Sequence, residues 1–322
     1  MNKKYTYVLL GVTSLVVVGT AGFLISEQIK GKETSQRQVE QYEKDTVITH
    51  QGKTYEYNSS LRTILFMGID KSEEMSEKTV GNGGQSDSLI LVILDSEKKN
   101  YRLLTISRDA MVDIQTYDVH GEKLGTERAQ LALQYAYGDG EKRSCRLTKE
   151  AVSKLLYEIP IHSYVSLTIE GFSVLTDELG GVELTIPEDY TSLDPQFAAG
   201  KTMVMDGKTA ERYVRMRDKS VVGGNSQRMK RQEQFLTAMV ETLQKKLHEN
   251  PDSFSSIMKV MEPYMETDLM ADQGKKLAEF EQVGEITSVP GEVQRGDEHD
   301  EFIVDNEKLK ELVLELFYKS KE

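Results

Sequence analysis

Three apolar runs rich in Ile, Leu and Val follow one another in the first third of the chain, between Arg62 and Ile106. They read TILFMGI, SLILVIL and YRLLTI, and polar or turn residues bound each of them. Runs of this length and composition predict buried β-strands. Neighbouring strands bring their ends to a common rim of a sheet, so polar residues at those ends are expected to meet.

Polar side chains stand at one end of each predicted strand. Asp70 follows the first run, Asp87 begins the second, and Arg108 and Asp109 follow the third. Carboxylate oxygens bind hard divalent cations, and an arginine guanidinium binds anionic groups through two parallel hydrogen bonds. The pattern therefore predicts a site for a divalent cation and an anionic ligand. In the alternative interpretation, these aspartates cap or turn the chain, and Arg108 with Asp109 is a local ion pair.

The remaining pattern alternates strands with helices and predicts an α/β fold, a single layered domain with a central mixed sheet flanked by helices on both faces. A hairpin is expected in residues 47–57, around Gln51 and Gly52. Helices are predicted within 121–140 and at 147–157, 171–179, 207–218, 227–247, 258–270 (interrupted by Pro263), 273–282 and 306–318. Strands are predicted at 162–169, 182–186, near 286 and at 302–304.

The N-terminus carries an uncharged stretch from Tyr5 to Ile25, preceded by Lys3 and Lys4. At about 1.5 Å per residue this stretch is long enough to cross the hydrocarbon core of a bilayer. It predicts one transmembrane helix at 5–25 as a signal anchor, a cytoplasmic tail at 1–4, a stalk at 26–45 and an extracellular domain at 46–322. The alternatives are a signal peptide cleaved after a small-residue triplet at 19–21, and the reverse orientation.

Composition narrows the classes of partner and cofactor. The formal net charge of −13 argues against nucleic acid, because a phosphate backbone requires a basic surface. The single cysteine, Cys145, allows neither an internal disulfide nor a cysteine-based metal site. The five histidines are scattered without ligand spacing, so no zinc site is predicted.

A basic segment interrupts this acidic chain. Residues 208–231 contain eight Lys or Arg side chains against two acidic ones. Arginine is the preferred residue for planar contacts with phosphate, so the segment predicts an anion-binding surface, while a solvated basic helix face is the alternative. The candidate ligand-binding residues are Arg215, Arg217, Arg228, Arg231 and Gln232.

An ordered set of motifs resembles the LytR–CpsA–Psr (LCP) family of Gram-positive bacteria. The set runs from about residue 64 to about residue 238, and its order is more specific than any one motif. The matching pieces are ILFMGID (64–70), QSDSLILVIL (85–94), LLTISRDAMV (103–112), LQYAYGDG (133–140), FSVLTDELGGVEL (172–184), MDGKTAERYVRMRD (205–218) and SQRMKRQ (226–232).

The resemblance implies an enzyme on the outer face of the cell membrane. Such a phosphotransferase takes a glycopolymer, a teichoic acid or capsular polysaccharide, from a polyprenyl diphosphate carrier. It attaches the polymer to peptidoglycan through a phosphodiester, with Mg²⁺ or Mn²⁺ as cofactor. The carrier lipid would lie in an apolar pocket between the sheet and the helices.

The motif matches imply roles for individual residues. Asp70 and Asp87 match the metal-associated aspartates, Arg108 matches the arginine of a Pro-Arg-Asp motif, and Asp109 becomes the candidate base for the acceptor hydroxyl. The matches to the diphosphate-binding side chains are Arg108, Arg215, Arg217, Arg228, Arg231 and Gln232.

Three departures from the family pattern support a rival interpretation. Ser107 stands in place of a proline, Gln130 in place of a lysine for which Arg128 is the nearby substitute, and Asn225 in place of an aspartate. A non-catalytic scaffold that binds polyprenyl phosphate during cell-wall assembly is therefore the first alternative. A membrane-linked transcription regulator is the second, and the acidic balance of the chain argues against it.

Overall fold

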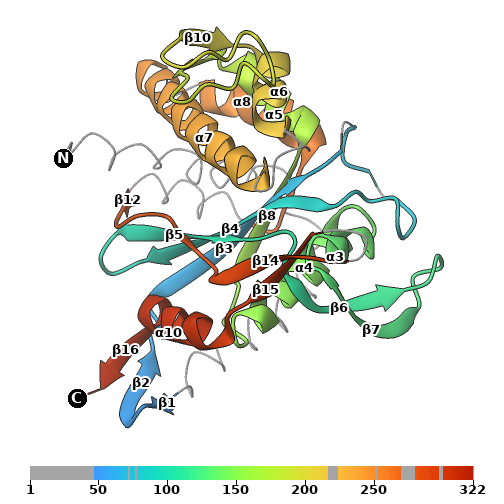
Figure 1. Ribbon diagram of the computed structural model, residues 1–322, viewed down its shortest axis with the longest axis vertical. Helices are drawn as coiled ribbons and strands as arrows, with labels where there is room; N and C mark the ends of the chain where they lie inside the picture. Colours follow the sequence, from blue (N-terminus) through green and yellow to red (C-terminus); the bar gives the residue numbers. More distant parts are fainter. Residues whose placement is uncertain are drawn as a thin grey trace.

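A central mixed sheet organises the computed structural model, which describes residues 47–71, 73–76, 78–216, 224–250, 253–269, 280–296 and 300–321. Its strand order is β11-β8-β3-β4-β5-β12, and β13 also pairs with β5 (Figure 1). β3 runs parallel to β8 and antiparallel to β4, and β4 runs antiparallel to β5, so the predicted mixed sheet is confirmed. The strands are β3 (Leu61–Ile69), β4 (Ser86–Asp95), β5 (Asn100–Ile106), β8 (Ser163–Thr168), β11 (Met265–Thr267), β12 (Glu281–Gln282) and β13 (Thr287–Ser288).

Both faces of the sheet are buried, which explains why its strands are almost continuously apolar. Ile64 of β3 pairs with Val92 of β4 and contributes to one core, whereas the next pair, Leu65 and Leu91, contributes to the other. Side chains alternate between faces along a strand, so two separate cores require apolar residues at every position.

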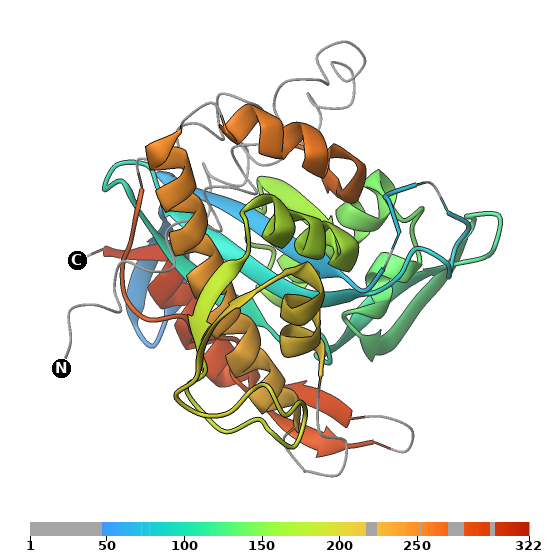
Figure 2. The ribbon, with the colours of Figure 1, turned by 90° about the horizontal axis from the view of Figure 1, so that it is seen from above.

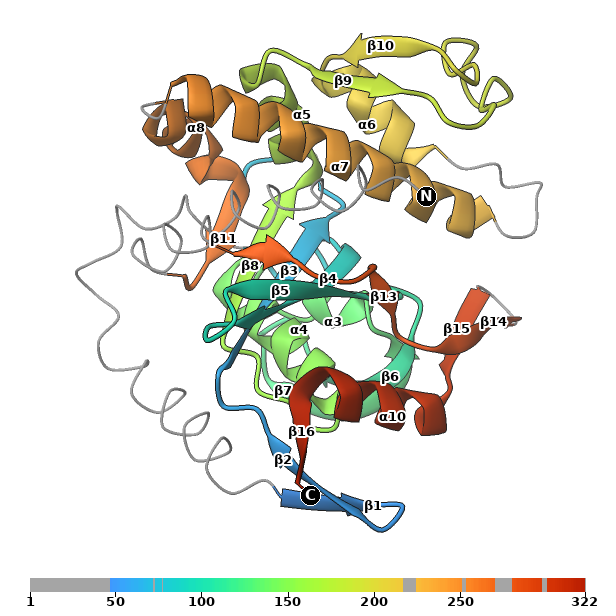
Figure 3. The same ribbon diagram turned by 90° about the vertical axis from the view of Figure 1, so that its left-hand side faces the viewer.

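Helices cover both faces, as predicted (Figures 2 and 3). One layer packs on the core that contains Ile64 and consists of α5 (Ile169–Glu178), α6 (Gly207–Arg215), α7 (Gly224–Glu249) and α8 (Ser253–Met261), with the short 3-10 helix η1 (Glu262–Tyr264) after α8. The other layer packs on the core that contains Leu65 and consists of α3 (Leu133–Ala136), α4 (Lys142–Leu155) and α10 (Asn306–Phe317).

Short sheets surround this framework. The predicted hairpin at 47–57 is confirmed, with Gln51 and Gly52 at φ 50° and 77°, as a two-residue turn with positive φ requires. The outer pairs and strands are β1 (Val47–His50) with β2 (Lys53–Tyr57) and β16 (Tyr318–Lys321), β6 (Met111–Tyr117) with β7 (Lys123–Gln130), β9 (Val182–Thr185) with β10 (Thr202–Met205), and β14 (Gly291–Arg295) with β15 (Asp300–Val304).

Two predicted helices are wrong in part. Of the helix expected at 258–270, Glu262–Tyr264 is a 3-10 helix and Met265–Thr267 forms strand β11. The larger difference is the helix expected within 121–140. Within 121–140, residues 123–130 form strand β7, which pairs antiparallel with β6, and only the four residues of α3 are helical. Leu131, Ala132 and Tyr135 are buried at a spacing that imitates a helix face, but that spacing covers a single turn. Pairing with β6 decides the conformation of the preceding residues, because strand formation depends on the partner strand more than on local preference.

Several predictions fall on residues outside the described part of the chain. They include the transmembrane helix at 5–25, the stalk at 26–45 and most of the helix expected at 273–282, whose last two residues form β12. Among the described residues, none of the helices is both long and apolar enough to cross a bilayer. The membrane anchor therefore stays a prediction.

Glu266 on edge strand β11 makes the stability of the fold depend on pH. Burial raises the pKa of this carboxyl to about 7, and the nearby carboxylates, among them Asp268, act in the same direction. The native state then keeps a proton that the unfolded chain releases above pH 4.5, so stability falls as pH rises from about 4.5 to about 7. We expect Glu266→Gln to raise the free energy of unfolding by about 2 kcal/mol at pH 8 and far less at pH 4.5, measured by urea denaturation.

The matched control is Glu262→Gln, since Glu262 is exposed on η1, the turn that precedes β11. This variant is expected to change the free energy of unfolding equally at both pH values. An equal gain at pH 4.5 and pH 8 for Glu266→Gln would contradict the proposed cost of ionising this carboxyl.

Candidate functional site

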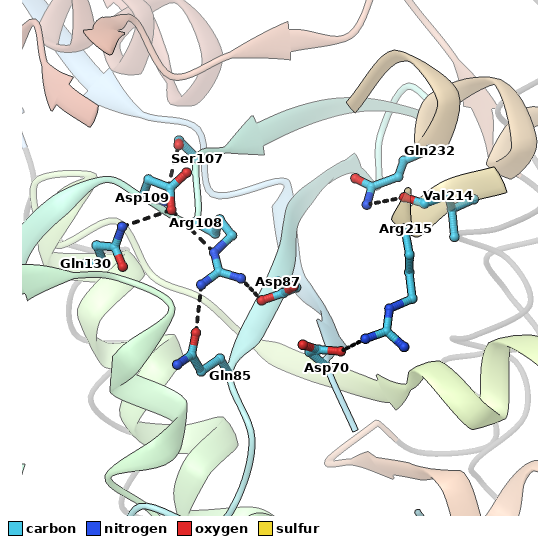
Figure 4. Close-up of polar contacts among 10 residues, drawn as sticks. All are labelled: Asp70, Gln85, Asp87, Ser107, Arg108, Asp109, Gln130, Val214, Arg215 and Gln232. Atoms are coloured by element: carbon cyan, nitrogen blue, oxygen red, sulfur yellow. Dashed lines mark hydrogen bonds and ion pairs between the residues drawn. The ribbon is translucent and has the colours of Figure 1, made fainter. Parts of the chain in front are cut away.

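The ends of three neighbouring strands meet at one rim of the sheet. Because β3, β4 and β5 alternate in direction, the end of β3, the start of β4 and the end of β5 lie side by side. Asp70, Asp87 and Arg108 therefore come together (Figure 4). The backbone N–H of Asp70 also donates to the carbonyl of Gln85, at 3.0 Å, which joins the two strand ends directly. The predicted convergence of the strand-end side chains is confirmed.

Arg108 is the centre of the first contact group. Its Nη1 donates to Asp87 Oδ1, and its Nη2 donates to Gln85 Oε1 at 2.7 Å. Its Nε lies 3.4 Å from Asp109 Oδ1. With the side chain 19% exposed, these contacts at its three nitrogens fix the orientation of the planar guanidinium group at the rim.

Arg215 is the centre of the second contact group and belongs to the helical layer. It lies in the last turn of α6, and its Nη2 donates to Asp70 Oδ1 at 2.8 Å although the two residues are 145 positions apart. Its Nη1 donates to Glu211 Oε1 at 2.7 Å, one helical turn earlier. Arg215 thus connects the rim of the sheet to the helices above it (Figure 4).

Two residues of α7 hold the end of α6 in place. Arg231 donates from Nε to the carbonyl of Tyr213 at 2.8 Å and from Nη2 to the carbonyl of Met216. Gln232 donates from Nε2 to the carbonyl of Val214 at 3.2 Å. The last carbonyls of a helix have no partner within the helix, so α7 satisfies the groups on both sides of Arg215.

The environment of Arg231 gives this side chain a structural role. It is fully buried, and its guanidinium carbon lies 5.0 Å from the ring centroid of Tyr190 and 6.0 Å from that of Tyr213. Burial lowers its pKa below the usual value for arginine. Arg228 is half-buried on the same helix, and Arg217 lies outside the described residues. Phosphate contacts by Arg217, Arg228, Arg231 and Gln232 stay predictions.

Asp109 is held by two neighbours that the sequence did not connect. Gln130 donates from Nε2 to Asp109 Oδ1 at 3.0 Å, and the hydroxyl of Ser107 accepts from the backbone N–H of Asp109 at 3.3 Å. Arg128, the suggested substitute for a missing cation, lies 3.6 Å from Asp113 on the β6–β7 hairpin and is 59% exposed. Arg128 is therefore paired on the hairpin, and Gln130 itself is the residue that contacts Asp109.

Sequence reasoning also missed Gln85 and Glu211 as members of the site. Gln85 stands two residues before Asp87 at the start of β4, and this position was a usable signal, since a residue there must lie at the same rim. Glu211 stands four residues before Arg215 on a predicted helix, and that spacing favours an ion pair. Neither a single glutamine nor a single glutamate indicates a functional site by its residue type alone.

The donor atoms at the rim suit a hard cation. Asp70 and Asp87 supply carboxylate oxygens from adjoining strands, and each has one oxygen bound by an arginine. Across the described ranges, no cluster of three or more His, Cys, Asp or Glu side chains is arranged to hold a metal ion. A cation at Asp70 and Asp87 would therefore take its other ligands from water and phosphate oxygens, which is the usual arrangement for Mg²⁺.

Comparison with known proteins identifies the family. The model of the LytR_cpsA_psr family matches residues 22–317. A relative from Bacillus subtilis, polyisoprenyl-teichoic acid–peptidoglycan teichoic acid transferase TagV, is 30% identical over 74% of this chain, which corresponds to 58% of the relative's length. The TagU transferase of Enterococcus faecalis is 28% identical over 86% of this chain and 83% of its own.

Solved structures agree on the fold. The crystal structure of B. subtilis TagV matches with a TM-score of 0.58 and 26% identity, over 80% of this chain and 97% of that one. The family match covers almost all described residues, including the strand ends and helices that build the rim. The chain therefore belongs to the LytR–CpsA–Psr family.

Proposed function

We propose that this chain is a Mg²⁺-dependent phosphotransferase that moves a glycopolymer from a polyprenyl diphosphate carrier to peptidoglycan through a phosphodiester. The proposal includes a membrane anchor at 5–25 and a catalytic domain on the outer face of the cell membrane. The polymer would be a teichoic acid or a capsular polysaccharide. The observation that carries the proposal is the junction at the rim, where Arg108 from the sheet reaches Asp87 and Arg215 from the helical layer reaches Asp70.

The reaction exchanges one P–O bond for another. An acceptor hydroxyl attacks the phosphorus that carries the glycopolymer, the bond from this phosphorus to the bridging oxygen breaks, and polyprenyl phosphate leaves. Asp109 takes the proton of the hydroxyl, and negative charge develops on the bridging oxygen. Guanidinium groups that are already oriented stabilise this charge without reorganisation, and this is the role of Arg108 and Arg215.

The contact groups carry more negative than positive charge, which supports a metal requirement. The carboxylates of Asp70, Asp87, Asp109 and Glu211 outnumber the guanidinium groups of Arg108 and Arg215. A diphosphate would add further negative charge at this rim. A divalent cation held by Asp70 and Asp87 would compensate that charge and polarise the phosphoryl oxygens.

The layer between the sheet and helices α5–α8 supports an isoprenoid carrier. This core is rich in flexible apolar side chains, and several of them are only partly buried. Methionine is unbranched and polarisable, so it adapts to irregular apolar shapes. Partly buried members of this layer are Phe66, Ile90, Phe172, Met216 and Met258.

The test is transfer by the full-length chain in liposomes that contain a polyprenyl-diphosphate-linked glycopolymer, with peptidoglycan fragments as acceptor. Mass spectrometry would detect the phosphodiester product and the released polyprenyl phosphate. We expect product with Mg²⁺ and a fall of at least about 100-fold after removal of the metal with EDTA, because the cation contributes several kcal/mol to charge stabilisation. Added Mg²⁺ is expected to restore the rate.

Carrier binding without turnover in the presence of Mg²⁺ would contradict the enzyme and favour the scaffold. Equal transfer rates with Mg²⁺ and with EDTA would support the transferase activity but contradict the proposed metal requirement. A matched run with a polyprenyl monophosphate carrier tests the diphosphate, since this donor lacks the bond that breaks.

A further inference from the structure

The segment that carries Arg108 and Asp109 is clamped by two hairpins. Its carbonyls accept hydrogen bonds in succession: Arg108 from the N–H of Ala132 at 3.0 Å, Asp109 from the N–H of Phe302 at 2.9 Å, and Ala110 from the N–H of Leu131 at 2.9 Å. Ala132 and Leu131 follow β7, whereas Phe302 belongs to β15. The backbone at the end of β5 is therefore fixed from both sides.

A side chain joins the same two hairpins. Gln130, the last residue of β7, donates from Nε2 to Asp109 Oδ1 at 3.0 Å and to the carbonyl of Asp300 at 3.0 Å. A primary amide nitrogen carries two hydrogens, so both are used, one on the carboxylate and one on the first residue of β15. Figure 4 shows the amide of Gln130 directed at Asp109.

We propose that Gln130 is a positioning residue that orients the Asp109 carboxylate and couples it to the β14–β15 hairpin, which then borders the acceptor side of the site. This inference rests on the proposed function, in which Asp109 accepts the proton of the acceptor hydroxyl. A base must be held within hydrogen-bond reach of that proton, and a misplacement of about 1 Å costs about 100-fold in rate. One oxygen of Asp109 is fixed by Gln130, so the direction of the second oxygen is fixed as well.

The amide achieves this orientation without adding charge. The guanidinium of Arg108 already lies 3.4 Å from the same oxygen, and Gln130 adds a directed hydrogen bond without a second cation. The amide also makes the position of Asp109 depend on β15, because the same nitrogen binds the Asp300 carbonyl. Displacement of the β14–β15 hairpin would therefore move the Gln130 amide and change the orientation of the Asp109 carboxylate.

The experiment compares Gln130→Ala, Gln130→Glu and Gln130→Lys in the full-length chain. Alanine removes the donor, glutamate keeps the shape but cannot donate, and lysine keeps a donor with added charge. We expect alanine and glutamate to lower kcat about 10- to 100-fold with the donor KM within twofold, because diphosphate contacts are untouched. Lysine is expected to recover part of the rate, because its ammonium group can still donate a hydrogen bond to Asp109.

A second readout does not depend on activity. Hydrogen–deuterium exchange of residues 300–304 is expected to accelerate in the alanine and glutamate variants and to stay slow in the lysine variant. The matched control is Gln115→Ala, on neighbouring strand β6, whose side chain contacts Tyr117 and Glu150 instead of Asp109. This control is expected to match the wild type in both measurements.

The outcomes separate this inference from the proposed function. If the wild type transfers and Gln130→Ala has the wild-type kcat, the inference is wrong while the proposed function stands. If the wild type does not transfer, the proposed function fails, and the exchange of residues 300–304 still decides whether Gln130 fastens the hairpin. Unchanged exchange in both the alanine and the glutamate variants overturns the coupling.

Discussion

Replacing Arg108 with alanine is expected to lower the transfer rate roughly 100- to 1000-fold, the size of effect seen when one oriented donor to a developing charge is removed. Arg108 lies at the strand rim with its guanidinium oriented by Asp87, Gln85 and Asp109. The loss should appear mainly in kcat, because the leaving phosphate gains charge as the bond breaks. The measurement is product formation under saturating donor with Mg²⁺ present.

Two further variants sharpen this result. Arg108→Lys keeps the positive charge but loses the planar fork, so an intermediate rate is expected. Arg128→Ala removes an exposed arginine paired with Asp113 on the β6–β7 hairpin and is expected to change the rate less than twofold. If Arg108→Ala transfers at the wild-type rate while its melting temperature is unchanged, the proposed role of this guanidinium is rejected.

The largest loss of stability is expected from Arg231→Ala. This change removes two hydrogen bonds from a charged, fully buried group to the carbonyls of Tyr213 and Met216. Each hydrogen bond of this kind contributes about 1.5 kcal/mol or more, so the free energy of unfolding should fall by about 3 kcal/mol. For a domain of this size, the melting temperature should fall by roughly 6 to 12 °C, measured by calorimetry.

The neighbouring Lys230→Ala is the matched control. Lys230 is 58% exposed and lies 3.6 Å from Glu188, so its loss should change the free energy of unfolding by less than about 0.5 kcal/mol. Arg231→Ala is also expected to lower the transfer rate, since Arg231 holds the backbone on both sides of Arg215. A wild-type melting temperature for Arg231→Ala would contradict the structural role.

Helix starts were predictable where an aspartate stands just before the helix. The starts expected at residues 207 and 306 agree with α6 and α10. Asp206 accepts from the N–H of Thr209 at 2.8 Å, and Asp305 accepts from the N–H of Lys308 at 3.1 Å. These caps act over three residues, so the information lies entirely in the local sequence.

Strand β7 and the contacts of Gln130 were not predictable in the same way. Whether residues 123–130 form a strand depends on β6, and the bond from Gln130 to Asp300 joins residues 170 positions apart. The identity of a glutamine does not indicate which distant residue its side chain will contact. The helix wrongly predicted within 121–140 and the unrecognised contact of Gln130 with Asp109 have the same cause. Pairing between distant segments selects among local conformations that the local sequence leaves almost equal in energy.

The amino-acid sequence alone determined the central strands, the layered α/β class and the presence of charged residues at the strand ends. Burial on both faces demands long apolar runs, and such runs are visible without knowledge of any contact. Only the tertiary structure decided that Arg215 reaches Asp70, that Arg231 holds the end of α6, and that Gln130 holds Asp109. These contacts depend on how α6, α7 and the hairpins pack on the sheet, since short-range polar contacts form only after the apolar layers have set the distances.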